Sequence, residues 1–467
     1  MEYGSGGYNF AGKESAPFAA QVVGSSTAFM KQKSELAQFR TEILIVFIFL
    51  GSIGFPGTYR KIFGAFVQTL YEYLSFLLQI AIMLRSSGEN IMDVRLLDIK
   101  PRYSPIYQFM VFVFAESMLV TTTRSAQLVT CLRLSVTILF SIWLVENLSL
   151  HRIIKLFSFA QVLLNLAIIG IIVLRPGLAF QSGDTFSHAL RGVYEAKNAM
   201  ASELAFGLVI LSLYVMDEAK EKNRFSAFWL AAMALQIILL LMAKATGALL
   251  ISVMIALYHF VFGKLQDLRL PLGWIYVICS VGFLIFAFTI LPLFAPLLES
   301  MGKDATLTGR TELWNGIYRF MQQHNMLTGF GYGQFWNSQA NVRKLHLMYN
   351  RKSYFSRMST GAHNQIMELW LNIGLLGIAS YFLAIIGSMR FVKYMKQDEY
   401  MKLSSIFFYL TLCGLTERIF ENAYAYRVVM FFILLAVACS WLPDRKLLRR
   451  RKTYEQEPVD NGDRTDL

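Results

Sequence analysis

The stretch that decides the fold is SAFWLAAMALQIILLLMAKATGALLISVMIALYHFVF, residues 226–262. It holds one lysine and no aspartate, glutamate or arginine. A transmembrane helix needs about 20 mainly apolar residues to cross about 30 Å of hydrocarbon. At about 1.5 Å per residue, one continuous helix over this stretch would exceed the thickness of the bilayer. We therefore predict two membrane helices joined by a turn at Lys244-Ala245-Thr246-Gly247.

The composition of the whole chain supports the same fold class. Its 467 residues are 55% hydrophobic and 16% charged, with a mean hydropathy of +0.46. This is far more apolar than a soluble domain, so a water-soluble fold is excluded. The aromatic content of 14% suits aromatic belts at the two membrane interfaces. The cysteines lie in apolar stretches at spacings that indicate neither a disulfide framework nor a zinc site, and they are Cys131, Cys279, Cys413 and Cys439.

The same length rule predicts an all-α integral membrane protein of about 12 transmembrane helices. The predicted spans are 42–56, 62–84, 105–121, 128–147, 153–174, 197–215, 226–243, 245–262, 273–294, 362–388, 402–419 and 425–442. Residues 1–40 show no cleavable signal sequence, so the first apolar run is expected to remain as a span.

These spans divide the chain into five parts. We predict a cytoplasmic N-terminal segment (1–40), nine helices (41–294), a large outer loop (295–361), three further helices (362–442) and a cytoplasmic tail (443–467). The tail is basic at its start and its polar end is expected to be disordered.

The orientation is predicted from lysine and arginine in alternate short loops, which favour the cytoplasmic side. These residues are Arg85, Arg95, Lys100, Arg102, Lys220, Lys222, Arg224, Arg390, Lys393, Lys396, Lys402 and the tail from Arg445 to Lys452. Both termini are then cytoplasmic, and the loops 175–196 and 295–361 lie on the periplasmic or extracellular side.

The second of these outer loops is strongly basic. Its acidic residues between Lys303 and Thr360 are Asp304 and Glu312. Its basic residues there are Lys303, Arg310, Arg319, Arg343, Lys344, Arg351, Lys352 and Arg357. Long loops largely escape the charge rule, so a tolerated charged loop is one interpretation. The other is a site for an anion.

Two polar segments at the outer boundary are candidates for that site. In the first, residues 190–198, Arg191, Lys197 and Asn198 precede or begin a helix, where the macrodipole favours an anion. Interfacial snorkelling is the alternative for Lys197. In the second, Arg310 and Arg319 could form a guanidinium pair for a phosphate, and the glycines of 329–333 allow either close backbone approach or a simple turn.

A third segment, residues 361–368, leads from the loop into the next span. His363, one of 6 histidines, could take a proton from a hydroxyl or steady a charged group near neutral pH. A structural role remains the alternative. Glu368 follows five positions later and does not share a helical face with His363, so the spacing does not predict a dyad.

The order of these motifs resembles the bacterial O-antigen ligase and O-antigen polymerase superfamily. The motifs are Arg-Gly-x-x-x-x-Lys-Asn at 191–198, Thr-Gly-Arg-x-x-x-Trp at 308–314, Gly-x-Gly at 329–331 and His-Asn-x-x-x-Glu-x-x-x-Asn-x-Gly-x-x-Gly at 363–377. Where many members have a Ser-Arg-Gly-Ala-like turn, this chain has Lys244 at a shifted position.

The resemblance implies glycan transfer from an undecaprenyl-pyrophosphate carrier to a sugar hydroxyl, without a metal, another cofactor or a nucleotide sugar. It assigns the pyrophosphate to Arg191 and Arg310 and the reacting centre to His363. The residues expected to contact substrate are Lys197, Asn198, Lys244, Arg319, Asn364 and Glu368. The expected location is the bacterial cytoplasmic (inner) membrane. The bilayer and other polysaccharide-assembly proteins are expected partners, and nucleic acid is not.

Three alternatives remain at this stage, and one of them, a membrane scaffold without chemistry, would leave the three outer segments unexplained. A ligase would move finished glycan onto lipid A core or protein, whereas a polymerase would join repeat units. A flippase or other transporter of lipid-linked oligosaccharide is a different class, which should place ionisable residues deep within several spans. Here these residues concentrate at the outer boundary, which favours the enzyme.

Overall fold

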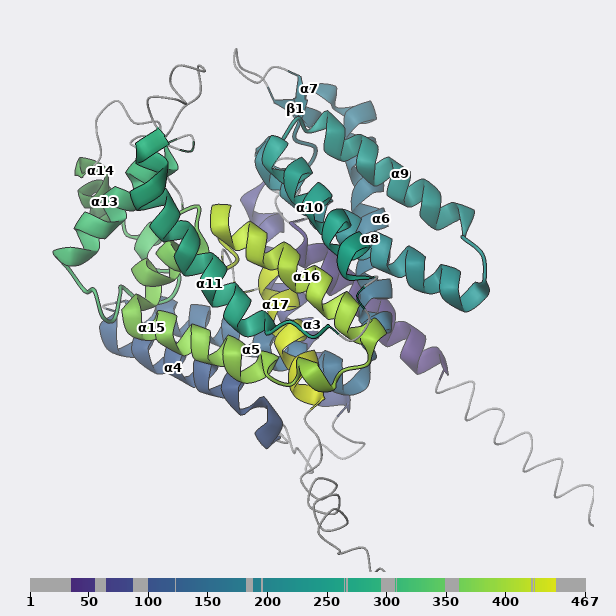
Figure 1. Cartoon of the computed structure of the whole chain (residues 1–467), viewed down its shortest axis with the longest axis horizontal. Helices are drawn as coiled ribbons and strands as arrows, with labels where there is room; N and C mark the ends of the chain where they lie inside the picture. The colour runs from purple at the N-terminus through teal and green to yellow at the C-terminus, as the bar shows by residue number, and fades with distance from the viewer. Residues whose placement is uncertain are drawn as a thin grey trace, which may run out of the picture.

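The computed structural model describes residues 35–54, 64–86, 100–121, 123–181, 188–194, 196–263, 265, 268–294, 307, 309–348, 361–420, 423 and 425–441. Its α-helices are one over residues 35–52, then α3 (Ala65–Ser86), α4 (Ser104–Val120), α5 (Arg124–Asn147), α6 (Leu150–Leu174), α7 (Pro176–Ala179), α8 (Lys197–Lys222), α9 (Ala227–Met242), α10 (Thr246–Phe262), α11 (Leu272–Ile285), α13 (Arg310–Gln322), α14 (Gln339–Leu347), α15 (Gln365–Met389), α16 (Gln397–Thr416) and α17 (Tyr426–Ser440) (Figure 1).

Short elements complete the described chain. They are the 3₁₀ turns η1 (Pro101–Tyr103), η3 (Leu291–Phe294), η4 (Phe335–Asn337) and η6 (Val392–Tyr394), the π-helical turn η2 (Phe286–Ile290), and the strands β1 (Phe180–Gln181) and β2 (Ala189–Leu190). The two strands pair antiparallel, with Phe180 opposite Leu190.

The all-α membrane fold is confirmed. Within the described residues, seven helical segments are long and apolar enough to cross a membrane: Phe66–Arg85, Pro101–Val120, Arg124–Asn147, Leu150–Leu174, Lys197–Lys222, Leu272–Phe294 and Gln365–Tyr394. The other five predicted spans fall on the helix over 35–52 and on α9, α10, α16 and α17, which lie outside that set. The chain is therefore a multi-pass membrane protein, and the count of twelve spans stays a prediction. Residues 1–34 and the tail 443–467 lie outside the described residues.

The hairpin predicted in residues 226–262 is confirmed. Helix α9 ends at Met242 and α10 begins at Thr246. Between them Lys244 adopts a φ of 49°, a left-handed conformation that turns the chain. Both helices pack against α8.

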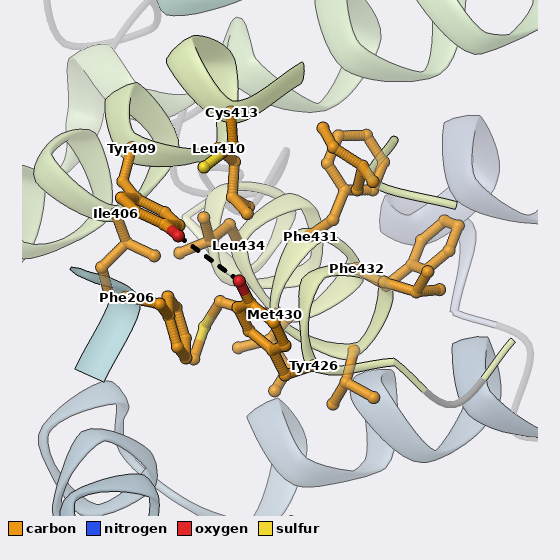
Figure 2. Close-up of a cluster of buried hydrophobic side chains, with 14 of the residues drawn as sticks. Phe206, Ile406, Tyr409, Leu410, Cys413, Tyr426, Met430, Phe431, Phe432 and Leu434 are labelled. Carbon is orange, nitrogen blue, oxygen red and sulfur yellow. Dashed lines mark hydrogen bonds between the residues drawn. The ribbon is translucent and has the colours of Figure 1, made fainter. Parts of the chain in front are cut away.

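The centre of the bundle is α17. Its side chains are buried from Tyr426 to Cys439, on every face of the helix. It packs against α5, α15 and α16 (Figure 1). A helix that is apolar all round belongs in the interior of a large protein. Figure 2 shows the hydroxyl groups of Tyr409 and Tyr426 meeting in this core, 3.3 Å apart.

Polar side chains join three of the other helices. Gln236 of α9 donates to the Leu204 carbonyl of α8 at 2.8 Å, and it accepts from Asn165 of α6. A Cβ on Gly207 would lie 2.3 Å from the Gln161 side chain, so a larger residue there would displace the polar side chains between these helices. Small residues and hydrogen bonds of this kind hold membrane helices together.

The predicted outer loop contains folded structure over residues 309–348. A Gly-rich segment before η4 inserts into a break in α15 at Gly374, whose φ is 63°. Phe330 N donates to Leu371 O at 3.0 Å, and Gly331 N donates to Asn372 O at 2.7 Å. The glycines that were predicted to allow close backbone approach therefore do so, but toward another part of this chain.

Two predicted span ends are wrong. The span 402–419 was expected to include Glu417, but α16 ends at Thr416. The span 362–388 was expected to include His363, but α15 begins at Gln365 because Asn364 Oδ1 accepts hydrogen bonds from two backbone N–H groups of its first turn. Both corrections place a charged or titratable side chain in a loop instead of a membrane-spanning helix. The free-energy cost of burying that group in hydrocarbon is thereby avoided.

Candidate active site

One carboxylate, Glu417, holds two of the predicted catalytic residues. Arg310 Nη2 donates to Glu417 Oε1 at 2.8 Å, and the other terminal nitrogen donates to the Thr416 carbonyl. His363 Nδ1 lies 3.1 Å from Glu417 Oε2. Residues that are 107 and 54 positions from Glu417 in the sequence therefore meet on its two oxygens.

The local structure explains how His363 reaches this position. The Trp314 indole of α13 is buried and donates to the Ala362 carbonyl at 2.8 Å. Asn364 caps α15 and donates to the Leu415 carbonyl at 3.0 Å. Between these two anchors His363 has a φ of 49°, which is uncommon for a residue with a side chain. Such backbone strain persists only where the surroundings enforce it, and it concentrates at functional sites.

The charge of Glu417 is set by its neighbours. Burial alone would raise the pKa of this carboxyl. The hydrogen bond with His363 and the positive charge of Arg310 outweigh burial and lower the pKa from 4.5 to about 2. Glu417 is therefore ionised at any physiological pH, and its side chain is 27% exposed.

Glu368, which was expected to contact substrate, lies beneath this site. It is 2% exposed. One of its oxygens accepts from Ala362 N at 2.9 Å, and the Trp336 indole donates to the carboxylate at 3.0 Å. Asn372 adds a contact at 3.2 Å. The structure thus assigns Glu368 to holding the turn that carries His363.

Arg418 adds positive charge beside the same turn. Its guanidinium packs on Gly361, where an added Cβ would lie 2.7 Å from it. Arg418 Nη1 is 3.9 Å from Glu368 Oε1. The Arg418 side chain is 19% exposed, so part of its charge faces away from these contacts.

Arg427, the second residue of α17, lies below the candidate site and is 7% exposed. Its guanidinium donates to the Arg418 carbonyl at 3.1 Å and to Ser202 Oγ of α8 at 2.6 Å. The negative charges of Glu203 and Glu417 both attract it. Arg427 therefore ties the Glu417 segment to α8.

The remaining predicted cations form a second cluster where α8 begins. Lys197 Nζ donates to the Lys244 carbonyl at 3.2 Å, so the N-terminus of α8 meets the turn between α9 and α10. Arg191 is half-buried and its Nε donates to the Leu178 carbonyl at 3.1 Å. Asn198 is exposed.

Arg427 also lies close to this second cluster. Tyr194, three residues after Arg191, is buried and lies near the charges of Arg427 and Glu203. Tyr194, in the segment that carries Arg191, and Glu417, the partner of Arg310, therefore both lie within electrostatic range of the same buried guanidinium.

One expected pairing does not form. Arg310 begins α13 and Arg319 lies in its last turn, which separates them by about 13.5 Å along the axis and turns them to opposite sides of the helix. Arg319 is exposed. The expected guanidinium pair is therefore wrong. Glu195, Thr308, Lys303, Arg351, Lys352 and Arg357 lie outside the described residues.

Sequence reasoning missed Glu417, Arg418 and Arg427. The signal was present, because each is an ionisable residue inside a predicted span, and such residues indicate function by default. Among the described residues, no group of three His, Cys, Asp or Glu side chains could hold a metal ion.

A comparison with protein families finds one match. Residues 229–382 match the model of the O-antigen ligase family. These residues resemble an O-antigen ligase domain. The matched segment runs from α9 into α15 and includes Arg310 and His363, whereas Arg191 and Glu417 lie on either side of it. The match supports the similarity of the chain to the O-antigen ligase and polymerase superfamily. A comparison with curated proteins finds no match.

An O-antigen ligase domain implies ligase- or polymerase-type enzyme activity in polysaccharide assembly. Its substrates are lipid-linked glycans and its setting is a membrane. The site around Glu417 supplies the residue types that such a transfer requires.

Proposed function

We propose that the chain transfers a glycan from undecaprenyl pyrophosphate to a sugar hydroxyl, at the outer face of the bacterial cytoplasmic membrane. The observation that carries this proposal is the Glu417 carboxylate, which holds Arg310 and His363 together. Arg310 supplies a permanently charged fork for a phosphate, and His363 supplies a base.

The proposed reaction is a displacement at the anomeric carbon of the donor. The acceptor hydroxyl oxygen forms a bond to that carbon, and the bond between the carbon and the pyrophosphate oxygen breaks. The leaving pyrophosphate takes the bonding electron pair, and the hydroxyl proton moves to His363. Because the energy lies in the bond that breaks, no nucleotide is consumed.

The hydrogen bond to Glu417 sets the role of each imidazole nitrogen. When Nδ1 donates its proton to Glu417 Oε2, the lone pair of the neutral ring lies on Nε2. Nε2 is then the atom that receives the hydroxyl proton. The carboxylate stabilises the imidazolium that results, as a buried acid does in other base-catalysed transfers.

Negative charge grows on the pyrophosphate as it leaves, so cations must already stand where that charge develops. Arg310 shares the Glu417 carboxylate with His363, and Arg418 lies beside the same turn. Arg191, Lys197 and Lys244 are assigned to the far side of the donor, where they would hold the carrier or its first sugar.

The positions of the buried charged residues along their helices support a transporter less well than an enzyme. Glu203 lies in the second turn of α8, Arg427 is the second residue of α17, and Glu116 is four residues from the end of α4. Each is near one end of its helix. A transport path should carry such groups near the middle of several spans.

The test is reconstitution of the full chain in liposomes with undecaprenyl-pyrophosphate-linked oligosaccharide. We expect release of undecaprenyl pyrophosphate together with a longer or newly attached glycan, and loss of both products in His363→Ala. Movement of intact donor across the bilayer, with no pyrophosphate release, would establish the transporter instead. Glycan transfer that occurs only when lipid A core is added would identify a ligase.

A further inference from the structure

A cavity lies away from the candidate active site. It has a volume of about 790 Å³ and is formed by α8, α10 and α16, which pack against one another. Its lining begins at Leu208 of α8 and ends at Ser405 of α16. The candidate site lies at the other ends of these helices, at Lys197 and beyond Thr416. The cavity therefore faces the opposite side of the membrane.

Most of the cavity wall is apolar. Leucine, isoleucine, methionine and phenylalanine side chains of the three helices line it, among them Leu213, Met216, Ile255, Phe260 and Met401. Phe260 is 62% exposed, so the apolar wall continues onto the outside of the bundle. In a membrane protein, this outside is in contact with lipid chains.

One end of the cavity is polar and its charges balance. Lys402 is 7% exposed and lies 2.8 Å from Asp217 and 2.6 Å from Asp398. Lys220 lies 2.8 Å from Asp398. The lining thus contributes two ammonium groups and two carboxylates, which sum to zero.

Part of this polar end can still bind a ligand. The side chains of Lys220 and Asp398 are 65% and 50% exposed. A lysine ammonium has three donors and a carboxylate has about four acceptor positions. Lys220 makes one of these contacts and Asp398 makes two, one to each lysine, so both keep positions for a ligand. An ammonium donor beside a carboxylate acceptor matches a headgroup that carries a phosphate and an amine.

We propose that this cavity binds one zwitterionic phospholipid with a primary amine, of the phosphatidylethanolamine type. One acyl chain occupies the apolar wall, the phosphate meets Lys220, and the headgroup ammonium meets Asp398. An anionic headgroup would bring the same phosphate to Lys220 but no ammonium for Asp398. The ammonium and carboxylate of the lining therefore select the zwitterion.

Native mass spectrometry of the purified full chain tests this proposal. The chain is delipidated and incubated with phosphatidylethanolamine or phosphatidylglycerol of the same acyl composition. We expect one tightly bound phosphatidylethanolamine per chain, with at least about fivefold weaker retention of phosphatidylglycerol. Equal retention of the two lipids would overturn the headgroup assignment, and no retained lipid would overturn the site.

Two matched substitutions on α10 locate the binding. Ala256→Trp places an indole in the cavity, because Ala256 lines it, and should remove the bound lipid. Leu257→Trp is the control, since Leu257 is 59% exposed and does not line the cavity, and it should retain the lipid. Loss in the control alone, or retention in Ala256→Trp, would place the lipid elsewhere.

Discussion

The two ends of α16 carry charged clusters of opposite design. At its beginning Lys402 is shared by Asp217 and Asp398, and all three residues lie on regular helices. Beyond its end Glu417 is shared by Arg310 and His363, and His363 and Glu417 lie in loops. At the first end a cation is therefore held by acids, whereas at the second an acid is held by an arginine and a histidine, with Arg418 and Arg427 close by.

The difference between these ends indicates their roles. Charges paired on regular helices satisfy one another, which stabilises the bundle and suits a neutral ligand. Arginines that gather around a loop-borne histidine with a positive φ are arranged for an anion that comes and goes. The predictions below test this contrast from the largest expected effect to the smallest.

The largest effect is expected at His363. His363→Ala and His363→Gln should retain donor binding but slow transfer by about 10²–10⁴, the usual cost of losing a general base. Unreacted lipid-linked donor should accumulate. The control is His346→Ala, since His346 lies on α14 in the same loop region but outside the motifs. A damaging His346 change beside a silent His363 change would contradict the assignment.

Arg310→Ala should slow transfer about a hundredfold, equivalent to about 3 kcal/mol, because a cation facing a developing charge is lost. Arg310→Lys should recover only part of the rate, since lysine lacks the planar fork. Arg319→Ala, an exposed position on the same helix, is the matched control and should remain near wild type. Similar rates in Arg310→Ala and Arg319→Ala would contradict the assignment of Arg310 to the leaving pyrophosphate. Arg191→Ala should also lose transfer.

Gly374→Ala tests the backbone junction between α15 and the Gly-rich segment before η4. Gly374 combines a φ of 63° with a ψ of −170°, which is essentially restricted to glycine, and a Cβ there would lie 2.2 Å from Leu327 O. We expect destabilisation of at least about 3 kcal/mol, read as a lower midpoint of thermal unfolding in detergent. The control Gly282→Ala, with nothing within 4 Å of the added Cβ, should leave the midpoint unchanged.

The smallest effect is the pH dependence of stability that Glu417 contributes. Its folded-state pKa, about 2, lies below the ordinary 4.5, so the carboxylate stabilises the fold above about pH 4.5. That contribution is lost as the pH falls toward 2. The difference in thermal midpoint between wild type and Glu417→Gln should therefore shrink as the pH falls from about 4.5 toward 2. A difference that stays unchanged over this range would contradict this charge state.

The membrane class, the 226–262 hairpin and the position of several motif residues could be predicted because each rests on a local pattern. Apolar length identifies spans, and one lysine in an apolar run marked the turn. The meeting of Arg310, His363 and Glu417 could not be predicted, because it depends on long-range packing between three separate segments. Glu417 was included in a predicted span because apolar residues flank it. The motif identified Glu368, but the sequence did not show that its side chain is buried.

The most direct test of the central role of Glu417 is the transfer rate of purified Glu417→Gln, compared with Glu312→Gln. Glu312 lies in the first turn of α13, two residues after Arg310, and forms the matched control for a lost negative charge. We predict that Glu417→Gln stays folded and slows transfer on the order of tenfold to hundredfold, because the imidazole loses its orienting carboxylate. Glu312→Gln should transfer glycan at close to the wild-type rate. A wild-type rate for Glu417→Gln would contradict a site organised around that carboxylate.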